Sequence, residues 1–144
     1  MESKDLTVII VTFQSEKKIK DCLQSISSEV KVIVVENSNN EDFKKDIEGK
    51  FPNIKCILMG ENKGYAKANN EGLNQVKTKY ALVLNPDTII NKNAIKNFLI
   101  SAKKNNEFWL IGPANDQMVE INLNDNELIE VENLKGFAIF FNMS

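Results

Sequence analysis

The stretch LTVIIVT at residues 6–12 is an unbroken run of apolar and β-branched residues. Such a run is typical of a strand that is buried on both faces of a sheet. Ser15 then stands where it can cap a helix, and apolar residues recur every three or four positions from Ile19 to Ile26. A second apolar run follows at residues 30–35. Because parallel strands need a crossover that is usually a helix, this order predicts a strand–helix–strand unit of a parallel sheet.

The same alternation continues along the chain. Further strands are predicted at residues 54–59 and 80–84. Three amphipathic helices are also predicted. The first carries Phe43 and Ile47, the second has Ala66, Asn69, Leu73 and Val76 on one face, and the third spans residues 91–104. Repeated strand–helix units whose strands are apolar throughout predict an α/β fold, with a mostly parallel sheet flanked by helices on both sides.

The C-terminal third has a different pattern. Strand candidates separated by Asn- and Asp-rich turns lie at residues 108–111, 118–123, 128–131 and 137–141. They predict short antiparallel strands beside the parallel part of the sheet, with Trp109 in the core. The apolar run at residues 136–141 predicts either a core strand at the end of the chain or a domain cut from a longer protein. In the second case an uncovered apolar strand would favour self-association through residues 136–141.

Length and charge restrict the class of protein. With 144 residues and 16.3 kDa, residues 1–144 are expected to form a single domain. The chain carries 18 basic and 20 acidic residues and has a pI near 5.3, whereas nucleic-acid-binding domains are usually basic, so we expect no nucleic-acid partner. The N-terminus is polar, and no apolar run approaches the roughly 20 residues of a membrane span. We therefore expect a cytoplasmic protein, held at the inner face of the membrane only through other parts or partners.

Composition also restricts the chemistry. The chain has no histidine, which excludes histidine general bases, Ser-His-Asp triads and histidine-ligated metals within it. Cys22 and Cys56 lie inside apolar patterns without Cys-x-x-Cys spacing, so we expect core thiols and neither a zinc site nor a disulfide. Any catalysis must then use carboxylates, lysines or a metal ion held by oxygen ligands.

Polar loops follow each of the predicted parallel strands. They lie at residues 12–15, 36–40, 60–65 and 85–88. In open parallel sheets ligands bind outside the carboxyl ends of the strands, so these loops predict a site for a small polar ligand. The chain has neither the Gly-x-Gly-x-x-Gly fingerprint nor a P-loop motif, which argues against dinucleotide dehydrogenases and P-loop enzymes.

Four sequence blocks coincide with these strand ends. They are VIIVTF (8–13), VIVVENS (32–38), ENKGYAKANNEG (61–72) and LNPDT (84–88). In order and spacing they resemble family 2 glycosyltransferases, in particular the rhamnosyltransferase-like branch with the GT-A fold. Gly136-Phe137-Ala138 resembles the short Gly-Ala motif that follows in that family. The resemblance implies transfer of a sugar, usually with inversion, from a dTDP-, UDP- or GDP-linked donor to a glycan or lipid-linked acceptor, and polysaccharide assembly is the usual setting of such enzymes.

Position by position, the resemblance implies a nucleotide pocket and a metal site. The pocket would be formed by Thr12, Phe13, Glu36, Asn37, Asn62, Lys63, Gly64 and Asn69. Thr12 and Phe13 would lie along the nucleoside, and Glu36 would contact the base or the ribose. Asn85 and Asp87 stand at the position of the family's Asp-x-Asp motif, which implies that Asp87 binds Mn²⁺ or Mg²⁺ on the diphosphate of the donor.

The sequence departs from the family pattern in two places. Glu36 replaces the commoner and shorter aspartate. The family's catalytic base and acceptor-binding elements lie beyond the position of Ser144, so the chain resembles the donor half alone, truncated at its C-terminal end. We therefore expect a chain that binds the donor without turnover.

The sequence leaves a structural interpretation open for each of these residues. Residues 85–88 also fit an ordinary turn, Glu36 a solvated strand end, Lys63 a solvated loop residue, Phe13 a core residue and Asn69 a packing amide. Two rival functions are a nucleotide-binding module that never turns over and a sugar nucleotidyltransferase. The second has less support because no Gly-rich basic loop follows the first strand.

Overall fold

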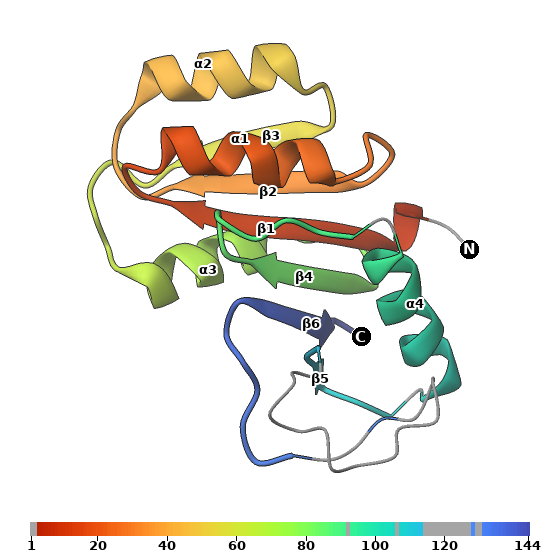
Figure 1. Ribbon diagram of the computed structural model, residues 1–144. Helices are drawn as coiled ribbons and strands as arrows, with labels where there is room; N and C mark the ends of the chain where they lie inside the picture. The colour runs from red at the N-terminus through yellow and green to blue at the C-terminus, as the bar shows by residue number, and fades with distance from the viewer. Residues whose placement is uncertain (1–2, 92, 106, 114–127, 129–130) are drawn as a thin grey trace.

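The computed structural model describes residues 3–91, 93–105, 107–113, 128 and 131–144. These residues form a six-stranded sheet with the strand order β3-β2-β1-β4-β6-β5, flanked by helices (Figure 1). The strands are β1 (Leu6–Thr12), β2 (Lys31–Glu36), β3 (Ile54–Leu58), β4 (Tyr80–Leu84), β5 (Leu110–Ile111) and β6 (Ala138–Asn142). The helices are the 3₁₀ turn η1 (Ser3–Asp5), α1 (Glu16–Ser25), α2 (Glu41–Lys50), α3 (Tyr65–Asn74) and α4 (Ala94–Lys104).

The direction of the strands divides the sheet into two parts. β1 pairs in parallel with β2 and with β4, and β2 pairs in parallel with β3. β6 runs antiparallel between β4 and β5. The predicted α/β fold, mostly parallel with antiparallel strands near the C-terminus, is confirmed. The strand candidate at residues 118–123, and residues 129–130 of the candidate at 128–131, lie outside the described residues, and the described residues 128 and 131 are not in a strand.

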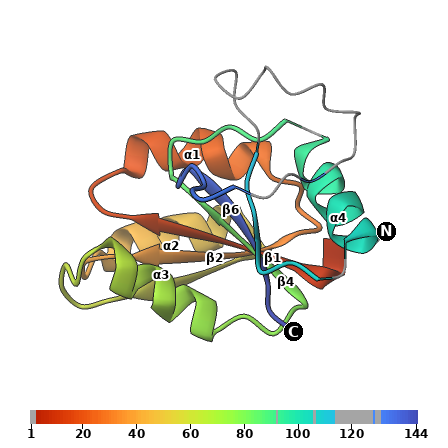
Figure 2. The ribbon, with the colours of Figure 1, turned by 90° about the horizontal axis from the view of Figure 1, so that it is seen from below.

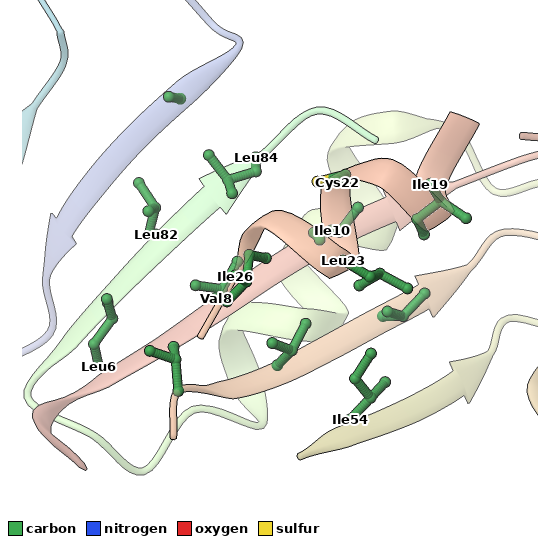
Figure 3. Packing of buried hydrophobic residues seen from close by; sticks show 14 of the residues in the cluster. Leu6, Val8, Ile10, Ile19, Cys22, Leu23, Ile26, Ile54, Leu82 and Leu84 are labelled. Atoms are coloured by element: carbon green, nitrogen blue, oxygen red, sulfur yellow. The ribbon is translucent and has the colours of Figure 1, made fainter. Parts of the chain in front are cut away.

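Strand alternation explains the two layers of helices. On β1, Val8 and Ile10 face a core cluster with Ile19 and Leu23 of α1, and Ile9 and Val11 face a second cluster on the other side. Residues of α2 and α4 also join the first cluster, whereas α3 joins the second. α1 and α3 accordingly lie on opposite sides of the sheet (Figure 2). Figure 3 shows the apolar side chains of α1 beside Val8 and Ile10 of β1.

α3 packs against the sheet through a residue that has no side chain. A Cβ atom added at Gly72 would lie 2.6 Å from Cγ2 of Ile9 and 3.1 Å from Cγ2 of Val35. The buried residues of α3 are Ala68, Asn69 and Gly72. The predicted face of this helix was therefore partly wrong, since Ala66 is exposed. Apolar periodicity could not find a contact made by a glycine backbone.

β6 brings the C-terminal aromatic residues into the core. Phe140 is fully buried, and its ring lies 5.2 Å from the rings of both Tyr80 and Phe98 and 6.0 Å from that of Phe108. β4 pairs with the whole of β6, and β5 covers the other side of β6 at Phe140 and Phe141, so the backbone is not a sheet edge at these two residues. The predicted self-association through residues 136–141 would need the side chains of β6, the backbone of its other residues or the adjoining edge strand β5.

Trp109 contradicts the sequence analysis. The prediction of a core tryptophan is wrong, because the residue is 89% exposed. It precedes β5, a strand of only two residues at the edge of the sheet, so its side chain lacks cover from the described residues. Among those residues, no helix combines the length and the apolar character that crossing a membrane would require.

Candidate functional site

The candidate site lies where the strand order changes direction. β2 lies on one side of β1 and β4 on the other, so the carboxyl ends of these strands meet at a switch point of the sheet. Open α/β sheets bind their ligands at such a point. The predicted loops after β1, β2, β3 and β4 all belong to this edge, which Figure 1 shows at the arrowheads of the parallel strands.

The last residue of β2, Glu36, is hydrogen-bonded to the turn that follows the strand. Glu36 is only 2% exposed. Its Oε2 accepts a hydrogen bond of 2.9 Å from the backbone N–H of Ser38, and the Ser38 hydroxyl lies 2.9 Å from both carboxylate oxygens. The interpretation of Glu36 as a solvated strand end is therefore wrong. The carboxylate is bonded within its own turn, and the predicted contact with base or ribose stays a prediction.

Asn37 joins three segments of the site. Its backbone N–H donates to the carbonyl oxygen of Thr12 over 2.8 Å. Its side-chain Nδ2 donates to Oδ1 of Asn62 over 2.9 Å, and its Oδ1 accepts from the backbone N–H of Lys63 over 3.0 Å. Asn37 is 3% exposed. This buried amide thus holds the ends of β1 and β2 against the loop before α3.

The loop before α3 continues this network. Oδ1 of Asn62 also accepts from the backbone N–H of Gly64 over 3.0 Å. Gly64 has a φ of +84°, a conformation that residues with a side chain adopt at a cost, and it stands directly before the first residue of α3. Lys63 is exposed, so its ammonium group is available to solvent or to a phosphate.

The end of β1 exposes an aromatic ring. Phe13 is 41% exposed, so its interpretation as a core residue is wrong, whereas Thr12 before it is buried. Gln14 has a φ of +51° and turns the chain from β1 into α1. Ser15 occupies the N-cap position of α1, as predicted, but its hydroxyl makes no capping bond and donates instead to the carbonyl oxygen of Phe13 over 3.0 Å.

The end of β4 is a turn that presents a carboxylate. The carbonyl oxygen of Asn85 accepts from the N–H of Thr88 over 3.1 Å, and the N–H of Asn85 donates to the carbonyl oxygen of Phe137 over 3.0 Å. The interpretation of residues 85–88 as a turn is therefore correct. Within this turn Asp87 is exposed. A turn and a ligand-binding role are compatible, because the turn fixes the backbone and leaves the carboxylate free.

Cys22 lies beneath the same turn. Its thiol lies 3.8 Å from the carbonyl oxygen of Asn85. Burial, together with the negative charge of Asp87, raises the pKa of the Cys22 thiol to about 11. Both cysteines are free and buried, so the prediction of core thiols is confirmed. A neutral, buried thiol is a poor metal ligand, and oxygen atoms are the donors that this edge offers.

The donor set of the β4 turn fits a divalent metal that also binds phosphate. Within the part of the chain that the structure describes, His, Cys, Asp and Glu do not gather in threes around a metal-sized space. Asp87 supplies one exposed carboxylate, and Asn85 carries an amide oxygen in the same turn. Mg²⁺ and Mn²⁺ are often held by one or two carboxylates while substrate phosphates and water complete the shell. A metal ion at Asp87 would therefore need the phosphate groups of a bound substrate as further ligands.

Asn69 lies inside the helix packing. It is 9% exposed, and its Nδ2 donates to the carbonyl oxygen of Tyr65 over 3.1 Å. Its Oδ1 is buried and accepts no hydrogen bond from the described residues. The burial favours the packing interpretation of Asn69. Hydrogen bonds thus join Thr12, Asn37, Asn62, Lys63 and Gly64. Phe13 and Asp87 lie in the turns after β1 and β4, and Asn69 lies one turn into α3.

Three residues of the predicted loops were not named individually among the predicted site residues. Ser38 satisfies Glu36, Gln14 sets the turn after β1, and the Tyr65 hydroxyl donates to Oδ1 of Asn85 over 3.1 Å. The sequence contained a signal for Tyr65. An aromatic residue at the first position of a polar helix is not expected to be buried, so its position indicates a role at the surface. A cavity of about 640 Å³ lies elsewhere, between the end of α1 and α4, and none of the predicted site residues lines it.

Comparison with known proteins relates this fold to a family. The profile of Glycosyl transferase family 2 matches residues 7–137. The low-salt glycan biosynthesis hexosyltransferase Agl10 of Haloferax volcanii is 34% identical over 113 residues, which is 76% of this chain and 36% of that protein. The teichoic acid poly(glycerol phosphate) polymerase of Staphylococcus epidermidis is 33% identical over 116 residues, 75% of this chain and 16% of that protein. The chain therefore spans about a third or less of the length of these relatives.

Solved structures share the fold. TarS 1–349 of S. aureus superposes with a TM-score of 0.70 at 21% identity over 99% of this chain and 47% of that chain. The mannosyltransferase PcManGT of Pyrobaculum calidifontis, solved with GDP-Man and Mn²⁺, gives 0.72 at 14% identity over 96% and 44%. TarS 1–349 in complex with UDP-GlcNAc gives 0.62 at 26% identity over 74% and 32%.

Proposed function

The chain belongs to glycosyl transferase family 2, and we propose that it binds a nucleotide-diphospho-sugar donor together with a divalent metal. The observation that carries this proposal is the meeting of the loops after β1, β2, β3 and β4 at one edge of the sheet, with an exposed ring and an exposed carboxylate among them. The sugar would pass, with inversion, to a glycan or lipid-linked acceptor in polysaccharide assembly.

In this proposal the residues of the loops at this edge have different roles. The half-exposed ring of Phe13 offers a flat apolar surface to a nucleobase. Asn37 and Asn62 keep the adjacent loop in place, and the Lys63 ammonium is free to meet a phosphate. Asp87 would hold the metal, which would supply positive charge to the diphosphate of the donor. Structural relatives were solved with GDP-Man and with UDP-GlcNAc, so the base stays open.

The proposal is tested by calorimetric titration with UDP, dTDP and GDP, with and without Mn²⁺. We expect one of these nucleotides to bind at least about tenfold more tightly when the metal is present. This factor corresponds to about 1.4 kcal/mol of binding free energy. Asp87→Asn should abolish this enhancement. Asp42→Asn, which alters an exposed carboxylate on α2, is the matched control and should leave it unchanged.

Two results would contradict the proposal in different ways. Binding of none of the three nucleotides would remove the donor site altogether. An enhancement that survives Asp87→Asn would leave the donor site but take the metal away from Asp87. We also propose that residues 1–144 bind without turnover, with the catalytic base outside them, and release of nucleoside diphosphate from sugar donors by this chain alone would contradict that part.

A further inference from the structure

Two halves of the proposed donor site are each held rigidly. In the nucleotide half, Asn37 ties the end of β1 to Asn62 and Lys63 through hydrogen bonds of 2.8 to 3.0 Å. In the metal half, the turn that carries Asp87 is fixed by backbone bonds from Asn85 to Phe137 and from Thr88 to Asn85. What connects the halves decides whether one responds to the other.

Tyr65 makes that connection. Its hydroxyl donates to Oδ1 of Asn85 over 3.1 Å, across 20 residues of sequence. Of the hydrogen bonds in the described ranges, this one joins the segment 62–65 to the turn 85–88. The bond therefore bridges the loop that follows β3 and the turn that follows β4.

Hydrogen bonds hold the backbone on both sides of Tyr65. It is the first residue of α3 and follows Gly64, whose backbone is bonded to Asn62. Its own carbonyl oxygen accepts from the buried side chain of Asn69. The ring is 50% exposed, so the hydroxyl has solvent within reach and still lies on Asn85. A backbone fixed at both sides and a rigid ring transmit a displacement better than a flexible side chain would.

We propose that the Tyr65 hydroxyl is a positioning group that couples nucleotide binding to metal binding, by holding Asn85 and with it the turn of Asp87. The inference rests on the proposed donor site and adds a residue and a device to it. A nucleotide that settles the loop 62–64 also settles Tyr65, and through Asn85 it reduces the freedom of the metal turn. By linkage, metal bound at Asp87 then favours the nucleotide by the same factor.

The test compares Tyr65→Phe with the wild-type chain, using UDP, dTDP and GDP as probes and Mn²⁺ as the metal. Tyr65→Phe keeps the ring and removes only the donor. The control is Tyr80→Phe, which makes the same chemical change at the core tyrosine of β4. The quantity measured is the factor by which Mn²⁺ tightens nucleotide binding, together with the factor by which the nucleotide tightens Mn²⁺ binding.

In Tyr65→Phe we expect both factors to fall by about threefold to tenfold, the value of one net hydrogen bond. Nucleotide binding without metal should stay within about twofold of wild type, as for a surface substitution. Asn85→Ala removes the same bond from the other side, together with an amide oxygen of the metal turn, and should lower the factors at least as much. Adding Tyr65→Phe to Asn85→Ala should then have no further effect, because the hydroxyl acts through Asn85.

The remaining outcomes separate this inference from the function on which it rests. Equal weakening of nucleotide binding with and without Mn²⁺ would assign Tyr65 a merely structural role and overturn the inference. Unchanged factors in Tyr65→Phe, with a normal enhancement in the wild type, would overturn it and leave the donor site intact. A wild-type chain that binds none of the nucleotides would overturn the donor site, and this inference with it.

Discussion

The ends of β2 and β4 both place a carboxylate at the same edge of the sheet, and the structure treats the two in opposite ways. Glu36 is 2% exposed and is bonded to the N–H and the hydroxyl of Ser38. Asp87 is exposed, and its turn is held through the backbone and side chain of Asn85. One acid is therefore part of the fold, and the other is presented to whatever binds there.

The difference in burial gives the two carboxylates different roles: Glu36 stabilises the fold, and Asp87 is accessible to a ligand. A buried carboxylate is tolerated only where hydrogen bonds replace its hydration, as Ser38 does for Glu36. Those bonds use about two of the four acceptor sites of the carboxylate, and the remaining sites are buried. An exposed carboxylate keeps its lone pairs for a cation at little cost to the fold. If stability depends on the β2 end and binding on the β4 end, substitutions at the two ends should affect these two properties differently.

The largest effect on stability is expected at the β2 end. Glu36→Ala leaves the N–H and the hydroxyl of Ser38 without their buried acceptor and opens a cavity under the site. We expect the free energy of unfolding to fall by about 2 to 4 kcal/mol, measured by urea denaturation. Glu61→Ala, an exposed acid in the neighbouring loop, is the control. A stability equal to that of the control would show that Glu36 is no structural part.

A second effect concerns the buried thiols near each carboxylate. Burial, with the charge of Asp87, raises the pKa of Cys22 from about 9 to about 11. Burial first, then the charge of Glu48, raises the pKa of Cys56 to about 12. A raised pKa means that the folded state binds the proton more tightly. The resulting stability is fully present below about pH 9 and is lost progressively as the pH rises from 9 to 11 for Cys22 and from 9 to 12 for Cys56.

Cys22→Ala isolates the part of this effect that belongs to the β4 end. At pH 11 the wild-type chain should have lost about 2 kcal/mol through Cys22, relative to pH 8, in addition to losses that both chains share. The measurement is urea denaturation of both chains at the two pH values. If the pH-dependent loss were the same in Cys22→Ala and wild type, the thiol beneath Asp87 would not be as buried as the structure has it.

A smaller effect is expected at Gln14, in the turn that leads from β1 past the site. Its φ of +51° lies in the left-handed region, which β-branched residues avoid. Gln14→Val should cost about 1 to 2 kcal/mol of unfolding free energy, whereas Gln14→Gly relieves the strain and should cost nothing. Thermal unfolding of the two variants decides the matter. Equal midpoints would mean that this turn relaxes and does not hold Phe13 in place.

The framework of the sheet could be predicted from the sequence, because its signals are local. β1 and β4 occupy the residues predicted from their unbroken apolar runs, 6–12 and 80–84. The face of α3 was partly missed because Gly72 packs without a side chain. Trp109 was misplaced, since hydrophobicity does not reveal that β5 is a two-residue edge strand.

The candidate site could be located but not resolved in the same way. The polar loops were found because they follow the strands. The contrast between Glu36 and Asp87 depends on contacts that spacing does not encode. Ser38 turns back onto Glu36 within two residues, and Tyr65 reaches Asn85 across 20. Both contacts follow from the three-dimensional course of the loops. The sequence therefore predicted a ligand contact for each acid, base or ribose for Glu36 and a metal ion for Asp87, without showing that Glu36 is buried and bonded within its own turn.

The smallest effect on stability is expected at Asp87, and it bears most directly on the comparison. Asp87→Asn should change the free energy of unfolding by less than about 0.5 kcal/mol at pH 7, as for other exposed substitutions. Its charge acts on Cys22, but that thiol is neutral at this pH, so no partner is lost. Urea denaturation beside Glu36→Ala measures the contrast. A cost at Asp87 as large as that at Glu36 would make both acids structural. Loss of metal-dependent binding with stability unchanged would mark the β4 turn as the part of this edge that serves the ligand.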